Sequence, residues 1–229
     1  MDKWKIEIEL MSEAIFGSGQ AVPGYLDLDI LHDEYGIPYF KGKTFKGKLR
    51  EELQAVADNI KAFNPHCDLI EYINSMFGLK ENFEKKFNDE KYKNDGCIKF
   101  SDCTMDTKII ECLIYGLEKG MFSKEEVLKA FTEIRSFTSI ADDGIAKEAS
   151  LRTFRIVNRG LKLYCDLFFE RELEEVEKEL LAAGVAALKH LGAMESRGKG
   201  LVKCSLLCND KDVTKEYLDA FERRVRQDG

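Results

Sequence analysis

The chain has few residues that would divide it into separate parts. It contains only 3 prolines in 229 residues, and it has no Ser/Pro-rich or Gly/Ser-rich run of the kind found in linkers. It also lacks the composition of a disordered protein, because 44% of its residues are hydrophobic. No apolar run is long enough to span a membrane. We therefore expect a single domain over residues 1–229 with no membrane partner.

Paired cysteine motifs are also absent. The 7 cysteines include no C-x-x-C pair, and the first residues, MDKWK, do not resemble a signal peptide. This pattern favours free thiols in a cytoplasmic protein. One metal alternative stays open, in which His66 and Cys67 join Cys97 or Cys103 on a zinc ion, although their spacing is not that of a zinc motif.

An excess of positive charge is missing as well. The 35 lysines and arginines are outnumbered by 42 aspartates and glutamates, which gives a net charge of −7. Such a chain is not expected to coat nucleic acid with its whole surface. The net charge does not exclude a local basic groove, so the positions of the basic residues decide whether the chain can bind nucleic acid.

Residue periodicity predicts a succession of strands and helices. Alternating apolar and polar residues predict strands, whereas apolar residues three and four apart predict helices. The expected strands cover residues 3–11, 97–103, 151–157, 160–169 and 200–208, and the expected helices cover 44–63, 67–77, 123–134, 171–191 and 211–226. Residues 107–118 fit either type of element.

Local signals at the ends of these elements add detail. Thr44 is expected to cap the first long helix, and Ser123 with Glu126 forms a capping box before another. The turn at 158–160, Asn-Arg-Gly, is expected to pair the two strands that flank it. The resulting β-α-β-β-α-β order predicts an α+β, ferredoxin-like (RRM-like) fold, in which an antiparallel sheet carries helices on one face.

A glycine-rich loop, LGAMESRGKGLV at residues 191–202, follows one of the expected helices. Because the negative end of the helix dipole would point at this loop, an anion could be held only by the loop amides with Arg197 and Lys199. The alternative is structural, with Gly192 ending the helix before a bend into the next strand.

A basic segment, GIPYFKGKTFKGKLREEL at residues 36–53, precedes a helix instead. Free N–H groups at a helix start together with lysines make an ordinary anion site. The alternative is a solvated basic turn, with Phe45 in the core rather than stacked on a base. If both segments bind phosphate, they are expected to lie on one shared channel.

These residues resemble the RAMP superfamily. GIPYFKGKTFKGKLR resembles its Gly-x-Pro-Tyr segment, GAMESRGKGLVKC resembles its glycine-rich loop, and CIKFSDC resembles its strand that ends at Asp102. IAKEASLRTFRIVNRGLKLYCDLFF is similar to the thumb-to-sheet segment of the backbone subunit of type III CRISPR interference complexes. The resemblance extends in order over most of residues 3–208.

The resemblance implies an assembly on RNA. Backbone subunits polymerise along CRISPR RNA as a filament of copies, together with other effector subunits, and a protruding thumb interrupts the pairing of guide with target RNA. In this sequence the thumb would lie at about 135–150, within an insertion at about 105–150. A second insertion, at about 64–95, would carry a small helical subdomain.

The resemblance also implies target RNA cleavage. An aspartate after the first strand of the family supports metal-dependent cleavage with Mg²⁺ or another divalent ion. Asp27 falls nearest to that position and would be both the catalytic residue and the metal ligand, while Asp29 and Asp33 are close enough to replace it in an alternative alignment. His32 is a rival general base, since its ordinary pKa lies near neutrality.

The expected RNA contacts lie in the two segments that resemble the family motifs. They are Lys41, Lys43, Lys46, Lys48, Arg50, Ser196, Arg197, Gly198, Lys199 and Gly200. The sequence departs from the family at Lys41, Lys43 and Thr44, where the family has a proline and serines, and at Met194-Glu195, where small residues would fit more easily. The added lysines suit RNA, whereas the carboxylate of Glu195 does not.

Two other functions stay open. A non-catalytic RAMP subunit that caps or structures the complex would agree with the acidic composition and the helix at 211–226. A guide-processing endoribonuclease of the same superfamily could use His32, but such enzymes resemble two ferredoxin-like units in tandem, and only one is expected here.

Overall fold

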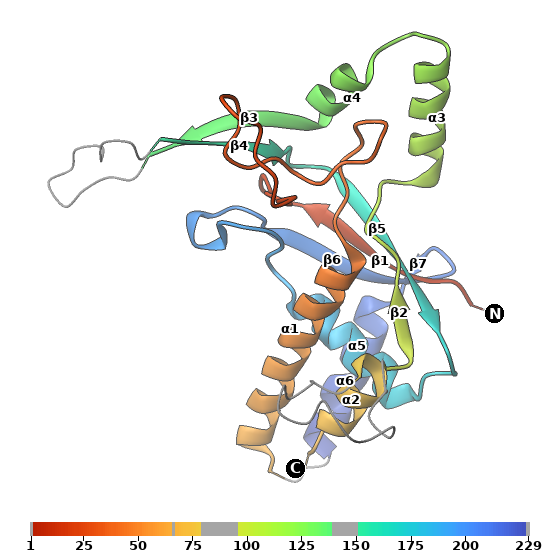
Figure 1. Cartoon of the computed structure of the whole chain (residues 1–229). Coiled ribbons are helices and arrows are strands. Elements are labelled where there is room, and N and C mark those ends of the chain that lie inside the picture. Colours follow the sequence, from red (N-terminus) through yellow and green to blue (C-terminus); the bar gives the residue numbers. More distant parts are fainter. Residues whose placement is uncertain (1, 66, 79–95, 139–150, 228–229) are drawn as a thin grey trace, which may run out of the picture.

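The computed structural model describes residues 2–65, 67–78, 96–138 and 151–227 (Figure 1). Within these residues, the main sheet has the strand order β2-β5-β1-β6-β7, and every neighbouring pair is antiparallel. Its strands are β1 (Trp4–Leu10), β2 (Ile98–Phe100), β5 (Lys162–Phe169), β6 (Val202–Cys208) and β7 (Lys211–Asp212). Helix α1 (Gly42–Phe63) lies between β1 and β2 in the chain, and α5 (Glu175–Ala187) lies between β5 and β6. This strand order with these two helices is the ferredoxin-like topology, so the predicted fold is confirmed.

Strand β1 lies in the centre of the sheet because its alternating pattern supplies one apolar face. Trp4, Ile6, Ile8 and Leu10 are all buried, whereas the residues between them are partly exposed. Hydrogen bonds to β5 on one side and β6 on the other satisfy the backbone of the strand. The sequence pattern thus fixes which face of the sheet the helices cover.

Four helices cover that apolar face (Figure 1). They are α1 (Gly42–Phe63), α2 (Ile70–Phe77), α5 (Glu175–Ala187) and α6 (Thr214–Gln227). Phe45, Leu49 and Leu53 of α1 are fully buried, as their spacing of four residues predicts. Helix α5 approaches α1 closely at Gly184, where an added Cβ would lie 2.5 Å from Cγ of Leu53.

Helix α6 is held to α5 by a charged contact. Arg224 donates from Nε and Nη2 to the two oxygens of Glu179, at 2.6 and 2.9 Å, and the Glu179 side chain is only 8% exposed. A bidentate pair of this kind fixes the orientation of both side chains. The helix predicted at 211–226 is therefore part of the helical layer.

The opposite side of the sheet carries a second group of elements (Figure 1). They are α3 (Thr107–Glu118), α4 (Lys124–Phe131), β3 (Thr132–Phe137) and β4 (Arg152–Val157). Strands β3 and β4 form an antiparallel pair of their own, and the predicted capping box of Ser123 and Glu126 is present at α4. The predicted thumb at 135–150 begins in β3, while residues 139–150 lie outside the described part.

One predicted strand pairing is wrong. The turn at 158–160 was expected to pair β4 with β5, but β4 pairs with β3 instead. Both edges of β5 are already occupied, by β1 and by β2. In addition, Gly160 has a positive φ of 84°, and its N–H donates to the carbonyl of Leu10. The turn therefore leads the chain from one sheet to the other.

The predicted helix cap is also wrong. Helix α1 begins at Gly42, and Thr44 lies inside it. The carboxylate of Asp102 accepts the Gly42 N–H at 2.8 Å, although the two residues are 60 positions apart. An added Cβ at Gly42 would lie 2.0 Å from the carbonyl oxygen of Ser101, so the helix start packs directly on the chain after β2. Local sequence signals cannot reveal a cap supplied from so far away.

Two glycine variants test the close packing of α1 and α5. Gly184→Ala should lower the free energy of unfolding by about 1–3 kcal/mol, because the new methyl group would overlap the buried Leu53. The control is Gly47→Ala in α1, where an added Cβ meets no atom within 4 Å. It should raise the same free energy by up to about 1 kcal/mol. Urea denaturation of both variants measures the difference, and equal stabilities would contradict the described packing.

Candidate nucleic-acid interface

The basic segment and the glycine-rich loop lie side by side, as expected for a shared channel. Lys48 Nζ of α1 is 3.2 Å from Oε1 of Glu195 in the loop. Next to this ion pair lies a hollow of about 260 Å³ between the two segments and the chain after β1. Its lining residues are Ile15, Gly17, Phe40, Thr44, Lys48, Gly192 and Ala193. Glu195, which departs from the family motif, thus pairs with a lysine of the basic segment.

The loop glycines serve two different purposes. Gly192 and Gly200 are structural, since an added Cβ would lie 2.5 Å from the carbonyl oxygen of Ile15 or 2.0 Å from that of Leu191. Gly198 is exposed, has a φ of 71° and would meet no atom within 4 Å. It follows a short 3₁₀ turn, Glu195–Arg197, whose last residue is exposed. Helix α5 ends at Ala187, so the expectation that Gly192 ends the helix is wrong. The two end glycines instead allow close backbone packing, and the tip of the loop is open to a ligand.

The basic residues of α1 divide between two faces of the helix. Lys41 and Lys43 are exposed near the helix start. By contrast, Lys46 donates to the carbonyl oxygen of Ile98 at 3.0 Å, and Arg50 donates to Oδ1 of Asn74 at 2.9 Å. These last two side chains already have protein partners on the side of β2 and α2.

The N-terminus of α1 is partly taken by the protein itself. Asp102 accepts the N–H of Gly42, so this donor is not available to a phosphate. The anion site expected at this helix start would thus depend on Lys41, Lys43 and Lys48 more than on the Gly42 amide.

A second hollow, of about 360 Å³, lies between the β3–β4 hairpin and the glycine-rich loop. The rings of Phe137 and Phe154 face each other across the hairpin, with centroids 5.6 Å apart. Arg152 and Arg197 add positive charge from either side. The full lining is Phe137, Thr138, Arg152, Phe154, Met194, Ser196 and Arg197. Sequence reasoning missed the hairpin residues, because the two strands are joined by residues 139–150 and their pairing carries no local signal.

Asp27 contacts Arg152, one of the residues that line this second hollow. Its carboxylate accepts the backbone N–H of Thr153 at 2.7 Å and lies 3.3 Å from Nη1 of Arg152. These contacts, above all the hydrogen bond from Thr153, lower the pKa of the Asp27 carboxyl. The side chain is 37% exposed, so an ionised carboxylate faces solvent beside Arg152.

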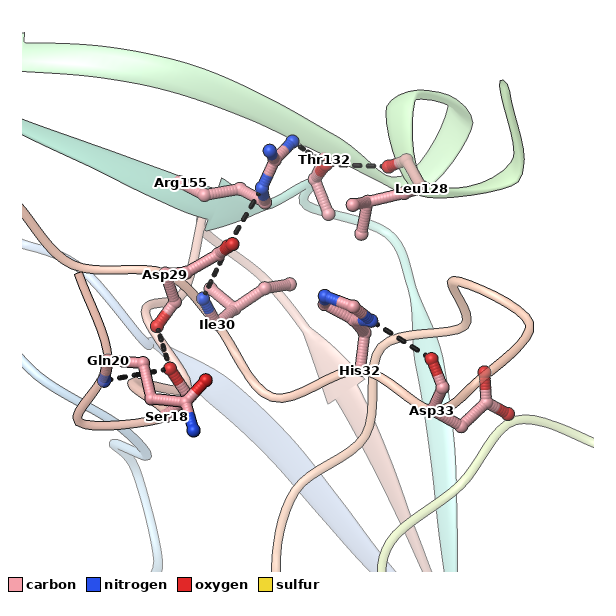
Figure 2. A network of polar contacts seen from close by, with 9 residues as sticks. All are labelled: Ser18, Gln20, Asp29, Ile30, His32, Asp33, Leu128, Thr132 and Arg155. Carbon is pink, nitrogen blue, oxygen red and sulfur yellow. Dashed lines mark hydrogen bonds and ion pairs between the residues drawn. The ribbon is translucent and has the colours of Figure 1, made fainter. Parts of the chain in front are cut away.

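Asp29, in contrast, is part of the internal structure (Figure 2). Its Oδ1 accepts from Nε of Arg155 at 2.9 Å and from the N–H of Ile30 at 2.8 Å. Arg155 lies in turn 3.4 Å from the hydroxyl of Thr132. Both charged side chains are largely buried, at 16% and 11% exposure. This pair joins the loop after β1 to the hairpin.

Asp33 and His32 have local roles in the same loop. Oδ1 of Asp33 accepts the N–H groups of Tyr35 and Ile37, each at 2.9 Å, which closes the turn before the basic segment. Nδ1 of His32 is 2.9 Å from the carbonyl oxygen of Asp33 (Figure 2). Of the three aspartates, Asp27 is therefore the most exposed, and it contacts Arg152 of the second hollow.

The residues near Asp27 do not fit a metal held by the protein alone. Within the described ranges, no group of three His, Cys, Asp or Glu side chains could hold a metal ion. The Asp27 carboxylate already accepts from an amide and lies beside an arginine. For the zinc alternative, Cys67, Cys97 and Cys103 are buried free thiols, and His66 lies outside the described residues.

No described helix has both the length and the apolar character required to cross a bilayer.

The different roles of the aspartates can be tested by stability. Asp29→Asn should lower the free energy of unfolding by about 2–4 kcal/mol, because it leaves the buried Arg155 without its counter-ion. Asp27→Asn should change stability little, since that carboxylate faces solvent. Urea denaturation measures both, and a larger loss for Asp27→Asn would contradict the assignment of Asp29 as the structural residue.

Comparisons with known proteins agree with this architecture. A chain in the cryo-EM structure of the type III-B Cmr-beta bound to cognate target RNA has a TM-score of 0.63 and 13% identity, over 95% of this chain and 99% of that chain. A chain in the cryo-EM structure of the type III-B Cmr-beta apo state has a TM-score of 0.60 and 13% identity, over 90% and 97%. No curated protein gives a significant sequence match. The family model of the RAMP superfamily matches residues 7–203, and the chain therefore belongs to this superfamily.

Proposed function

We propose that the chain is an RNA-binding subunit of a type III CRISPR effector complex. The observation that carries the proposal is the junction of two distant segments, in which Lys48 of the basic helix meets Glu195 of the glycine-rich loop beside two surface hollows. The likeness in fold to a chain of the Cmr-beta bound to target RNA supports it.

The distribution of charge supports RNA binding on this side of the molecule. Lys43, Lys48 and Arg197 lie on the elements that border the hollows, and phosphate contacts from such side chains supply most sequence-independent affinity. The outer face of the sheet, where RRM proteins stack bases, carries Glu7 and Glu9, and both carboxylates lie within ion-pair distance of Lys162. The proposed RNA path follows the loops because the two hollows lie there.

The second hollow supplies contacts for a base. Phe137 and Phe154 offer aromatic faces for stacking, and Arg152 and Arg197 can contact the adjoining phosphates. Because every base has a π-face, stacking of this kind does not depend on sequence. These features suit a subunit that must accept any guide.

More specifically, we propose that the chain is the backbone subunit of such a complex. Copies of the chain would line up along CRISPR RNA with other effector subunits, and the β3–β4 hairpin would project as the base of the thumb. The position of the hairpin across the sheet from the helical layer (Figure 1) supports this arrangement.

Target RNA cleavage would use Asp27. RNA carries its own nucleophile, because the 2′-oxygen can attack the adjacent phosphorus while the bond to the 5′-oxygen breaks. A nucleotide held in the second hollow would bring its ribose near Asp27, whose ionised carboxylate can accept the hydrogen bond of the 2′-hydroxyl. Arg152, 3.3 Å from Asp27, would stabilise the charge that develops on the phosphate.

The divalent metal implied by the family resemblance has no set of protein ligands among the described residues. Asp27 offers a carboxylate at this place, but that part of the chain contains no cluster of three suitable side chains. We therefore assign no step of the reaction to a metal.

A non-catalytic RAMP subunit is the second candidate. The observation that favours it is the ion pair between Asp27 and Arg152, together with the lack of metal-binding clusters in the described ranges. In that case Asp27 would serve only to dock the loop after β1 on strand β4.

Single charge removals test RNA binding. Lys43→Gln, Lys48→Gln and Arg197→Gln should each weaken the binding of unrelated RNA sequences alike, by about 3- to 10-fold, and should reduce the slope of log affinity against log salt by about 0.7. Fluorescence anisotropy over a salt titration measures both quantities. Lys215→Gln in α6, which removes the same charge from the helical layer, is the matched control. Equal losses for all four variants would contradict this location of the RNA.

Asp27→Asn tests cleavage in the assembled complex. If Asp27 orients the 2′-hydroxyl, the variant should bind target RNA normally and cut it about 100-fold or more slowly. Asp58→Asn, which changes an exposed aspartate of α1, is the control. Cleavage of labelled target RNA on a denaturing gel measures the rate. Cleavage at the native rate would exclude this role, and a native complex that does not cut at all would favour the non-catalytic candidate.

A further inference from the structure

Glu13 lies where the glycine-rich loop, the hairpin and the chain after β1 meet. Its carbonyl oxygen accepts the N–H of Gly200 at 2.7 Å. The next residue, Ala14, exchanges two backbone hydrogen bonds with Val157 of β4, at 3.0 and 2.7 Å. The backbone of Glu13 is therefore fixed on one side to the loop and on the other to the hairpin.

The carboxylate of Glu13 joins two cations from different elements. Oε2 accepts from Nζ of Lys199 in the loop, and Oε1 accepts from Nη2 of Arg135 in β3 at 3.2 Å. The hydrogen bond from Lys199 is the largest cause of the lowered pKa of the Glu13 carboxyl. The side chain is 25% exposed, so this carboxylate is ionised at neutral pH and within reach of solvent.

The three side chains border a third surface hollow, of about 480 Å³. It is lined by Met11, Ser12, Glu13, Glu133, Arg135, Asn158, Arg159 and Lys199. Nζ of Lys199 also lies 5.8 Å from the centre of the Phe137 ring, which lines the second hollow. Lys199 thus stands between the two hollows, and a phosphate of an RNA chain that ran from one to the other would pass the position of the Glu13 carboxylate.

We infer that Glu13 is an internal counter-ion that occupies the place of an RNA phosphate and must be displaced when RNA binds. The inference rests on the proposed function, because it concerns the same RNA path. A carboxylate held between a lysine and an arginine makes the contacts that a phosphate oxygen would make there. Its presence lowers the affinity of this surface for an arbitrary polyanion.

The two cations differ in what the loss of Glu13 would do to them. Arg135 keeps a second partner, since its Nη2 is 2.7 Å from Oε2 of Glu133. For Lys199, Glu13 supplies the one carboxylate contact found among the described residues. Removal of the Glu13 charge should therefore act on RNA binding mainly through Lys199, which provides a specific test by a double variant.

The experiment measures the binding of a labelled oligouridine of about 20 nucleotides, longer than a single-domain site, to the full chain by fluorescence anisotropy. Glu13→Gln keeps the size of the side chain and removes its charge. It should raise affinity about 3- to 10-fold and steepen the salt slope by about 0.7, because one more cation becomes available to phosphate. The gain should disappear in Glu13→Gln combined with Lys199→Gln.

A matched control separates this effect from net charge. Glu9→Gln makes the same charge change on the outer face of the sheet, where Glu9 lies 3.9 Å from Nζ of Lys162, and it should leave affinity within about 2-fold of native. Thermal unfolding confirms that each variant is folded. A folded Glu13→Gln that binds RNA no more tightly than native overturns the inference, as does an equal gain for Glu9→Gln.

The outcomes also distinguish the inference from the proposed function. If native chain binds RNA and Lys199→Gln weakens it, yet Glu13→Gln brings no gain, only the counter-ion role fails. If the native chain shows no salt-dependent binding and Lys199→Gln changes nothing, the RNA path itself is wrong.

Discussion

The whole interface depends on the backbone hydrogen bonds of one short segment, residues 11–18. On one side Met11 and Ile15 bond to the glycine-rich loop, through the Met11 N–H and the Ile15 carbonyl, and on the other Ala14 bonds to β4. Residues 14–16 are buried, so water cannot replace the bonds of Ala14 and Ile15, and each of these would be costly to break. The segment therefore fixes the position of the loop relative to the hairpin.

An acidic chain can carry a basic surface if the charges are paired internally. Around the loop, Lys48 faces Glu195, Lys199 faces Glu13, and Arg152 faces Asp27. Such pairs contribute little to stability because they are partly exposed. Their effect is to hold long side chains in place without leaving a strong positive field at the surface.

Much of the fold could be predicted from local pattern, and the failures share a cause. The alternation in β1 and the stripe of α1 depend on neighbours in sequence, so both were correctly predicted. The cap of α1 comes from Asp102, and the partner of β4 is β3 rather than the adjacent β5. In the same way, counting along the loop could not separate Asp27 from Asp29, because Arg155, which engages Asp29, lies 126 positions away. Contacts between distant segments decided each of these cases.

The register of β4 against the loop after β1 has a mechanical consequence. Strand β4 presents the ring of Phe154 to the second hollow, the amide of Thr153 to Asp27 and the guanidinium of Arg155 to Asp29. Because side chains alternate along a strand, a shift of one residue would turn the Phe154 ring away from the hollow. The same shift would separate the carboxylates of Asp27 and Asp29 from their partners on β4. The strand thus sets the spacing between the Phe154 ring and the Asp27 carboxylate, and a tilt of the hairpin would move the contacts of both together.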